Sequence, residues 1–431
     1  VNRPDLVDVF VLETHPDDPY RYRIDGEWRT LERREAPIEV RLWGHLHWTV
    51  RREVLWSVHG PVVRRPHGTY AIRFAGLGEV RQVEQWYRMN RARDREEWRA
   101  AMRLGALPMF NCVYADGEGH VEYLYNARLP RRAEGYDWSQ YLPGDTSETL
   151  WGSPLPFEEL PRVEDPPSGF VINANSSPFR ATVGPGNPDP EAYSATLGIE
   201  THLTNRARRA LELLAADASL TRAELDRVKF DVAYSAESRT ASTLRDLLSA
   251  APPSDPVARE GLEVLRGWDL RADPDNTAAA LALLTLRPSH DDDPGEAGTA
   301  ERMRHLGEAA RRMRAAFGRL DVPLKEVQRL RRGDLDLGVG GAPDVLRAVY
   351  ARPHDDGRLV GHAGDSYLLM VEWDSEGRVH SRSVHQYGSA TLDQNSPHYA
   401  DQAPLFVREE LKPIWMDEEK VRSNLEREYS P

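Results

Sequence analysis

The segment from Asn173 to Pro178 contains the residues whose chemistry is easiest to interpret. Two asparagines, Asn173 and Asn175, and two serines directly follow an apolar stretch, and a proline closes the segment. Asparagine at such a position tolerates a left-handed backbone and stabilises turns, which is one interpretation. The other is that one carboxamide serves as a fixed, uncharged N–H donor to a developing oxyanion, as acyl transfer requires. The residues alone leave both interpretations open.

The other polar residues form no strong metal or cofactor motif. The fourteen histidines contain no H-E-x-x-H pattern, and the single cysteine, Cys112, can complete neither a zinc cluster nor a disulfide within the chain. His45 and His47 have the spacing of one strand face, which surface side chains often share. Asp5 and Asp8 are close enough for a hard cation such as calcium, but two carboxylates are too few for a site. The sequence also lacks phosphate-binding loops, dinucleotide fingerprints and G-x-S-x-G elbows.

The composition is that of an ordinary globular protein with a sizeable core. The 431 residues are 40% hydrophobic and 29% charged, and the formal net charge is −13. Neutralising phosphates requires a positive face, so this balance argues against a nucleic-acid partner. Apolar runs stay well short of the roughly 20 residues that cross a bilayer, so no membrane span is expected.

Periodicity predicts strands at both ends of the chain and helices in the middle. An Asp-Gly turn predicts a hairpin over 110–125. Apolar residues recur at helical spacing within 81–104, 204–286 and 301–317, which predicts helices there. The further predicted strands cover 6–12, 38–42, 54–58, 70–74, 169–173, 366–373 and 378–385.

Loops and composition complete the predicted organisation. The proline-rich residues 129–167 predict a long functional or tightly packed surface loop, and the acidic run 290–295 predicts a solvated loop. We expect an α+β protein with a β-rich part at 1–200, a mainly helical region at 201–335 and a β-rich return at 336–431. The chain opens at Val1 without a start methionine or signal segment, so we expect a processed chain or a fragment.

Six short blocks align together with one known family. In chain order they are 1–10 (VNRPDLVDVF), 58–63 (VHGPVV), 111–119 (NCVYADGEG), 155–161 (LPFEELP), 169–178 (GFVINANSSP) and 396–402 (SPHYADQ). In this order they resemble the later portion of the penicillin acylase family of N-terminal-nucleophile hydrolases. The acyl-homoserine-lactone and lipopeptide acylase branch is the most similar. Each block alone is moderately specific, but six in register span nearly the whole chain.

The resemblance implies a fold, a maturation and a reaction. Family members fold as an αββα sandwich, are cut from a precursor into an α and a β chain, and are periplasmic or secreted. The new β-chain N-terminus, a Ser, Cys or Thr, attacks an amide with its own amine as base, and water releases the acid. We therefore expect an incomplete αββα Ntn-hydrolase sandwich with a helical insertion. Its reaction would be amide hydrolysis of an acyl-homoserine lactone, a lipopeptide or a β-lactam, without a required cofactor.

The resemblance also assigns active-site roles to individual residues of this sequence. The family holds the oxyanion with one backbone N–H, which falls on Val1, and one side-chain amide. That amide falls on Asn175 through the Asn-x-x-Pro spacing. The family's active-site arginine best matches Arg206, with Arg208 and Arg209 as alternatives in register. A surface position on a helix is the other interpretation of Arg206.

Two further assignments follow from the same resemblance. Some branches place an acidic residue near the nucleophile, late in the chain, and Glu372 is the candidate. The alternative for Glu372 is a carboxylate at the edge or end of a sheet. Some members bind calcium near the start of this region, and Asp5, Val7 and Asp8 match that cluster.

The chain departs from the family at its start. Val1 has no nucleophilic side chain, and in a relative the nucleophile would lie upstream of this position. We therefore expect the α chain and the N-terminal segment of the β chain as missing partners, and no useful turnover from this chain alone. A non-catalytic binding or scavenging descendant of the same fold is the alternative function. A carbohydrate-binding surface is a third interpretation, but the tryptophans form no patterned strip.

Overall fold

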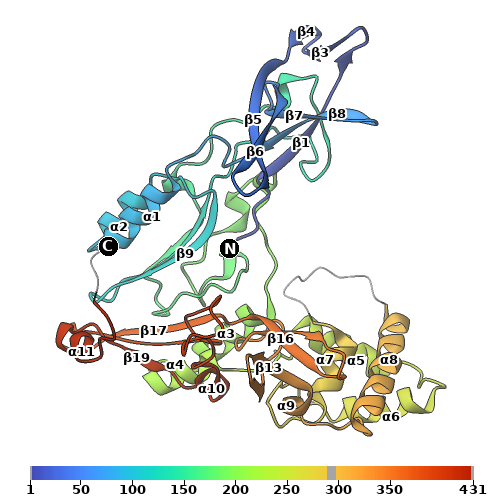
Figure 1. Ribbon diagram of the computed structural model, residues 1–431, viewed down its shortest axis with the longest axis vertical. Helices are drawn as coiled ribbons and strands as arrows, with labels where there is room; N and C mark the ends of the chain where they lie inside the picture. Colours follow the sequence, from blue (N-terminus) through green and yellow to red (C-terminus); the bar gives the residue numbers. More distant parts are fainter. Residues whose placement is uncertain (1, 289–297, 429–431) are drawn as a thin grey trace. The chain divides into compact units, whose positions relative to one another are not determined.

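The computed structural model describes residues 2–288 and 298–428. The chain forms two compact units, Val1–Thr201 and His202–Pro431, and each has its own sheets and core (Figure 1). Val1 and the acidic run 290–295 lie outside the described residues. Within the described ranges, no helix has the length and apolar character needed to cross a bilayer.

The first unit is built mainly from strands. Its largest sheet has the order β11-β1-β8-β7-β6-β5, and two smaller sheets have the orders β12-β10-β9 and β2-β3-β4. The elements are β1 Val7–Leu12, β2 Thr14–His15, β3 Asp18–Ile24, β4 Glu27–Thr30, β5 Glu32–Trp43, β6 Leu46–Trp56, β7 Pro61–Arg65, β8 Gly68–Phe74, α1 Gln82–Arg91, α2 Arg95–Met102, β9 Met109–Ala115, β10 Val121–Ala127, β11 Leu142–Pro143 and β12 Arg162–Glu164.

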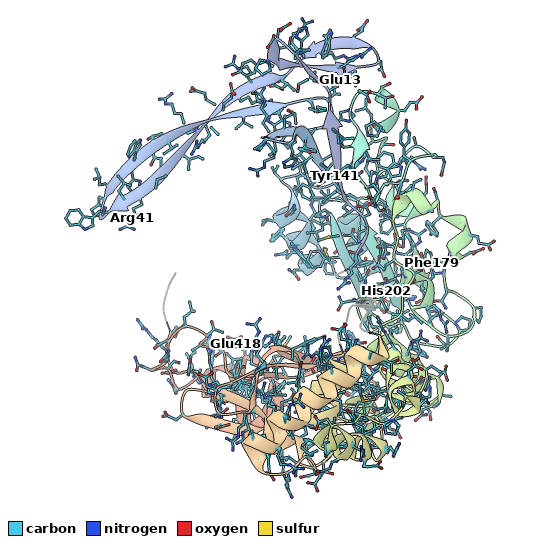
Figure 2. The ribbon with its side chains drawn as sticks, turned by 90° about the vertical axis from the view of Figure 1, so that its right-hand side faces the viewer. Glu13, Arg41, Tyr141, Phe179, His202 and Glu418 are labelled. Atoms are coloured by element: carbon cyan, nitrogen blue, oxygen red, sulfur yellow. The ribbon has the colours of Figure 1, made fainter. Side chains whose placement is uncertain are left out.

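Strands β5 and β6 form a long hairpin that projects from the first unit. Figure 2 shows it as a twisted arm with Arg41 near its end. The tip is exposed, and Trp43 is 84% accessible to solvent. His45 and His47 are exposed here, and His47 Nδ1 lies 3.3 Å from Glu39 Oε2. The two histidines are therefore surface residues of the arm.

The predicted hairpin at 110–125 is confirmed as β9 and β10, which pair antiparallel along their whole length. The predicted helical segment 81–104 is two helices, because Asp94 accepts a hydrogen bond from the Glu97 N–H and begins α2. Trp98 and Met102 of α2 belong to the same buried cluster as Tyr123 of β10. Helix α2 therefore packs on the β9–β10 hairpin.

The second unit combines helices with two sheets of order β14-β13-β16-β15 and β17-β18-β19. Strands β17 and β18 confirm the strands predicted at 366–373 and 378–385, and they pair antiparallel as a hairpin. The elements are α3 Asn205–Ala215, α4 Arg222–Lys229, α5 Arg239–Ser249, α6 Pro256–Arg266, α7 Ala279–Leu286, α8 Thr299–Phe317, α9 Leu324–Val327, β13 Gln328–Arg332, β14 Leu335–Gly338, β15 Val349–Pro353, β16 Leu359–Gly364, β17 Tyr367–Trp373, β18 Val379–His385, α10 Ala403–Val407, β19 Lys412–Ile414 and α11 Glu418–Ser423.

Helix α7 forms the centre of the second unit's core. It is apolar on all sides, as expected for an interior helix, and Leu281 in its middle is inaccessible to solvent. Leu262 of α6 and Leu306 of α8 belong to the same buried cluster. The three helices therefore share one core.

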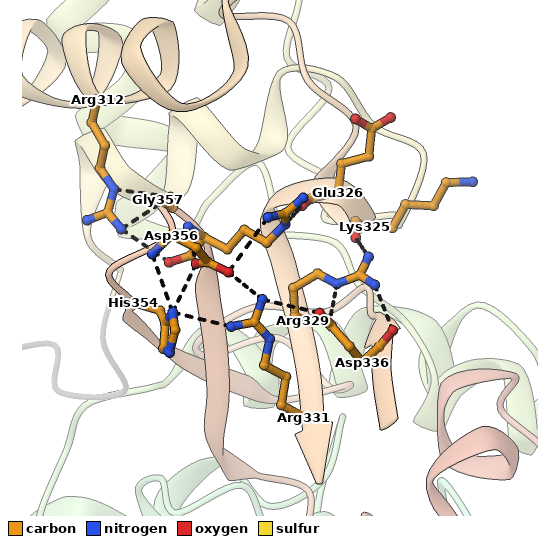
Figure 3. A network of polar contacts seen from close by, with 10 residues as sticks. Arg312, Lys325, Glu326, Arg329, Arg331, Asp336, His354, Asp356 and Gly357 are labelled. Carbon is orange, nitrogen blue, oxygen red and sulfur yellow. Dashed lines mark hydrogen bonds and ion pairs between the residues drawn. The ribbon is translucent and has the colours of Figure 1, made fainter. Parts of the chain in front are cut away.

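A polar network covers the surface of β13, β14 and the turn after β15 (Figure 3). Arg329 Nε donates to Asp336 Oδ1 at 2.7 Å, and Arg331 Nη2 donates to Asp356 Oδ2 at 2.5 Å. The hydrogen bond from Arg331 holds the pKa of Asp356 well below its usual range. Such exposed pairs stabilise a fold little, and this network contains none of the predicted site residues.

Candidate functional site

The strand predicted at 169–173 is wrong, since these residues form an irregular segment. Its backbone groups bind neighbouring loop groups instead of a ladder. Thr182 Oγ1 donates to the Phe170 carbonyl at 2.9 Å, and the Ile172 N–H donates to the Ala181 carbonyl at 2.7 Å. Hydroxyl side chains that bind the backbone offer it an alternative to a sheet, which periodicity does not reveal. The segment that leads to Asn175 is therefore held by side-chain and backbone hydrogen bonds to the loop at 181 and 182.

Asn175 is half-buried and has a left-handed backbone conformation, with φ of 56°. Its backbone N–H donates to Asn173 Oδ1 at 3.1 Å. Ser176 and Ser177, which follow, are 4% and 2% accessible. The turn interpretation of this segment is confirmed, and it leaves the oxyanion interpretation of the Asn175 carboxamide open, because the turn uses the backbone of Asn175.

A second asparagine attaches this turn to strand β9. Asn111 Nδ2 donates to the same Asn173 Oδ1 at 2.9 Å. Asn111 Oδ1 accepts a hydrogen bond from the Tyr123 hydroxyl of β10 at 3.0 Å. The loop of Asn175 is thus held on the β9–β10 hairpin by a continuous set of hydrogen bonds.

The start of the described chain is held on the same hairpin. Asn2 is fully buried, and its Nδ2 donates to the Asn126 carbonyl of β10 at 3.0 Å. The Arg3 N–H donates to Glu200 Oε1 at 2.9 Å, and the Tyr125 hydroxyl of β10 donates to the other oxygen of Glu200. Residues 2 and 3 are therefore fixed against β10.

These two attachments lie side by side on the ladder. Asn111, which holds the Asn175 turn, is paired with Tyr125, which holds residue 3 through Glu200. Paired residues of an antiparallel ladder have Cα atoms about 4.5–5.5 Å apart. The structure thus fixes the chain segment that follows Val1 and the turn of Asn175 on neighbouring positions of one hairpin.

Arg206 lies at the first turn of α3 in the second unit. Its Nε donates to Asp344 Oδ1 at 3.3 Å, and the Asn205 N–H donates to Asp344 Oδ2 at 2.8 Å. Asp344 is 4% accessible, and burial raises its pKa to about 6. The alternative Arg209 instead forms an ion pair with Asp231, with Nε 3.0 Å from Oδ1. The two arginines therefore have different partners.

Glu372 lies on β17, also in the second unit. Its carboxylate forms an ion pair with Arg222 at the start of α4. Its side chain is 33% accessible to solvent. The structure therefore shows Glu372 as the partner of a helix-start arginine, and its role near a nucleophile stays a prediction.

Of the predicted calcium ligands Asp5, Val7 and Asp8, the two carboxylates are brought together around an arginine. Arg132 Nη1 lies 3.1 Å from Asp5 Oδ2, and Nη2 lies 2.8 Å from Asp8 Oδ2. Across residues 2–288 and 298–428, no group of three or more His, Cys, Asp or Glu side chains is arranged to hold a metal ion. The calcium site stays a prediction, and a cation there would compete with Arg132 for both carboxylates.

Sequence reasoning missed the residues that support the predicted ones. Asn111 lies inside the family block 111–119. A polar residue in an otherwise apolar strand could have indicated that Asn111 has a role near the site. Arg132 and Asp344 gave no such signal, because their partners lie far away in the chain. Their roles follow only from long-range contacts.

Comparisons with known proteins identify the family to which this chain is similar. The family model described as penicillin amidase matches residues 1–423. An acyl-homoserine lactone acylase PvdQ from Pseudomonas putida is 24% identical over 97% of this chain and 59% of the relative. A penicillin G acylase from Escherichia coli is 33% identical over 40% of this chain and 20% of the relative. The chain thus spans about three-fifths of the length of the PvdQ relative.

A solved structure has the same fold. A thermostable penicillin G acylase from Alcaligenes faecalis matches with a TM-score of 0.66 and 19% sequence identity. The match covers 99% of this chain and 86% of that chain. The predicted fold class, a mixed fold of the Ntn-hydrolase type, is thereby confirmed.

Proposed function

The chain belongs to the penicillin amidase family, and from this premise we propose that the protein is an acylase that hydrolyses an acylated amide. The candidate substrates are acyl-homoserine lactones, lipopeptides and β-lactams, and we place acyl-homoserine lactones first among them. The similarity to PvdQ over 97% of this chain supports that order.

One structural observation carries the proposal. The turn of Asn175 and the segment after Val1 are held on paired positions of the β9–β10 hairpin. In this proposal, the Asn175 carboxamide and the Val1 backbone N–H both bind one carbonyl oxygen as it gains negative charge. Fixed donors of this kind stabilise the tetrahedral intermediate without reorganising during the reaction.

In the proposed mechanism, this chain supplies the oxyanion site and other segments supply the nucleophile. Asn175 Nδ2 and the Val1 N–H donate to the oxyanion, and Arg206 contributes positive charge. An N-terminal Ser, Cys or Thr of the mature protein attacks the amide, its own amine takes the proton, and water releases the acid. The α chain and the β-chain N-terminal segment are the missing partners, so this chain alone is expected to be inactive. Processing and a periplasmic or secreted location belong to the same proposal.

The test uses the full-length gene product. Acyl-homoserine lactones of short and long acyl chains and penicillin G are incubated with it, and the released acids are measured by chromatography. Asn175→Ala is expected to lower kcat roughly 100- to 1,000-fold, as loss of one oxyanion donor does. Asn424→Ala is the control, because the exposed Asn424 carboxamide binds the Lys420 carbonyl and the Ser423 hydroxyl at the end of α11, away from the Asn175 loop in the chain.

The outcomes separate the two candidate functions. Release of acid that depends on Asn175, but not on Asn424, supports the acylase. Absence of hydrolysis across all acyl lengths, together with tight substrate binding, supports the non-catalytic binding descendant. An unchanged kcat in Asn175→Ala contradicts the assignment of this residue.

A further inference from the structure

We infer that Asn111 and Tyr123 are positioning residues that hold Asn175 in its reactive conformation. This inference rests on the proposed function. These residues are connected in series through Asn173, since Tyr123 donates to Asn111, Asn111 donates to Asn173, and Asn173 accepts from the Asn175 N–H.

The geometry allows only one orientation of the Asn111 carboxamide. Its Nδ2 donates to Asn173 Oδ1 at 2.9 Å, and its Oδ1 accepts from the Tyr123 hydroxyl at 3.0 Å. A flipped amide would place two carboxamide oxygens against each other, which neither could satisfy. Tyr123 is 1% accessible, so its hydroxyl has no competing bulk solvent. The acceptor oxygen of Asn173 therefore selects the orientation in which Asn111 Nδ2 is a donor, and the buried Tyr123 hydroxyl binds the other end of that carboxamide.

Asn173 needs that donor to hold the turn. Its Oδ1 accepts two hydrogen bonds, one from Asn111 and one from the Asn175 backbone. Asn173 itself is exposed, so without Asn111 its side chain could rotate into solvent. Asn175 would then lose a hydrogen bond that supports its φ of 56°, a conformation that asparagine tolerates better than most other non-glycine residues.

The expected consequence is a loss of catalytic rate without a loss of binding. An oxyanion donor acts mainly in the transition state, so displacing it lowers kcat and leaves KM largely unchanged. A displacement of about 1 Å can cost roughly 100-fold in rate. A purely structural role of Asn111 would change stability alone.

The experiment compares two hydroxyl deletions on the same hairpin in the full-length protein. Tyr123→Phe removes the donor to Asn111, and Tyr114→Phe removes a hydroxyl that donates to Asp116 Oδ2 at 2.9 Å, outside this series. Asn111→Leu removes the whole connection at similar side-chain volume. The measurements are kcat and KM for the best acyl amide, melting temperature, and a crystal structure of Asn111→Leu.

We expect kcat to fall roughly 10- to 100-fold in Asn111→Leu and about tenfold in Tyr123→Phe, with KM within about twofold. Tyr114→Phe should retain the wild-type kcat, and the Asn175 φ should leave the left-handed region in the Asn111→Leu crystal. Equal kcat in all three variants, while Asn175→Ala is impaired, overturns this inference and leaves the acylase proposal intact. If the wild-type full-length protein releases no acid, both this inference and the acylase proposal are overturned. If Asn111→Leu does not fold, the comparison of kcat between Tyr123→Phe and Tyr114→Phe decides whether the inference holds.

Discussion

Arg132 and Asp8 form an ion pair in which neither side chain is accessible to solvent, with Nη2 2.8 Å from Oδ2. The rings of Trp138 and Trp151 lie 5.1 and 5.3 Å from the guanidinium carbon. The Trp151 indole N–H also donates to Asp8 Oδ2 at 2.5 Å. This cluster joins strand β1 to the proline-rich segment 129–167, so the long predicted loop is tightly packed.

Replacing Arg132 by methionine should destabilise the protein by about 3–5 kcal/mol, because the partner carboxylate stays buried without its counter-charge. Arg131→Met is the matched control. Arg131 forms an ion pair with Glu159, and both side chains are about half exposed. Loss of this pair should lower the free energy of unfolding by less than about 1 kcal/mol. Urea-induced unfolding followed by tryptophan fluorescence measures both values. Similar losses in the two variants would contradict the role of the buried pair.

His59 should make the protein sensitive to acid. The ring is fully buried, stacks on Phe10 at 4.3 Å between centroids, and has its pKa lowered by burial from 6.5 to about 4. The unfolded state therefore binds this proton more tightly than the folded state. The stability due to neutral His59 is complete above about pH 6.5 and is lost as the pH falls toward 4.

The measurement for His59 is the free energy of unfolding at several pH values between 4 and 7. Compared with wild type, His59→Leu should show a shallower decrease toward acid, whatever its absolute stability. An NMR titration that places the His59 pKa near its usual value would refute the expectation.

Arg206 and Arg208 are distinguished by mutation in the full-length protein. Arg206→Ala should lower kcat/KM roughly 10- to 100-fold, because it removes the positive charge that the proposed mechanism assigns to Arg206. Arg208→Ala should leave kcat/KM near the wild-type value. A larger effect at Arg208 would transfer the active-site assignment to that residue.

Cys112 should be unreactive in the folded protein. Its residue is 8% accessible, and burial raises the pKa of the thiol to about 12. The thiolate is the nucleophile, so iodoacetamide at pH 8 should leave the native protein unmodified and label it fully in urea. Mass spectrometry gives a clear result because the chain has one cysteine. Rapid labelling under native conditions would show that this part of the first unit opens.

Much of the local structure could be predicted because it depends on near neighbours. The Asp-Gly turn predicts the β9–β10 hairpin, and apolar spacing predicts helices such as α3 and α5. The break between α1 and α2 was missed, although Asp94 is a typical helix-capping residue. The strand predicted over 169–173 is wrong because nearby hydroxyls bind its backbone.

For the candidate site, the sequence by itself determined the chemical type of Asn175 and its place in a family block. Only the tertiary structure decided what holds that residue. Asn111 reaches Asn173 across 62 positions, and Arg206 reaches Asp344 across 138. Hydrogen bonds and ion pairs between such distant residues depend on how strands and helices come together in three dimensions. Periodicity and local propensity describe only the single element to which each residue belongs.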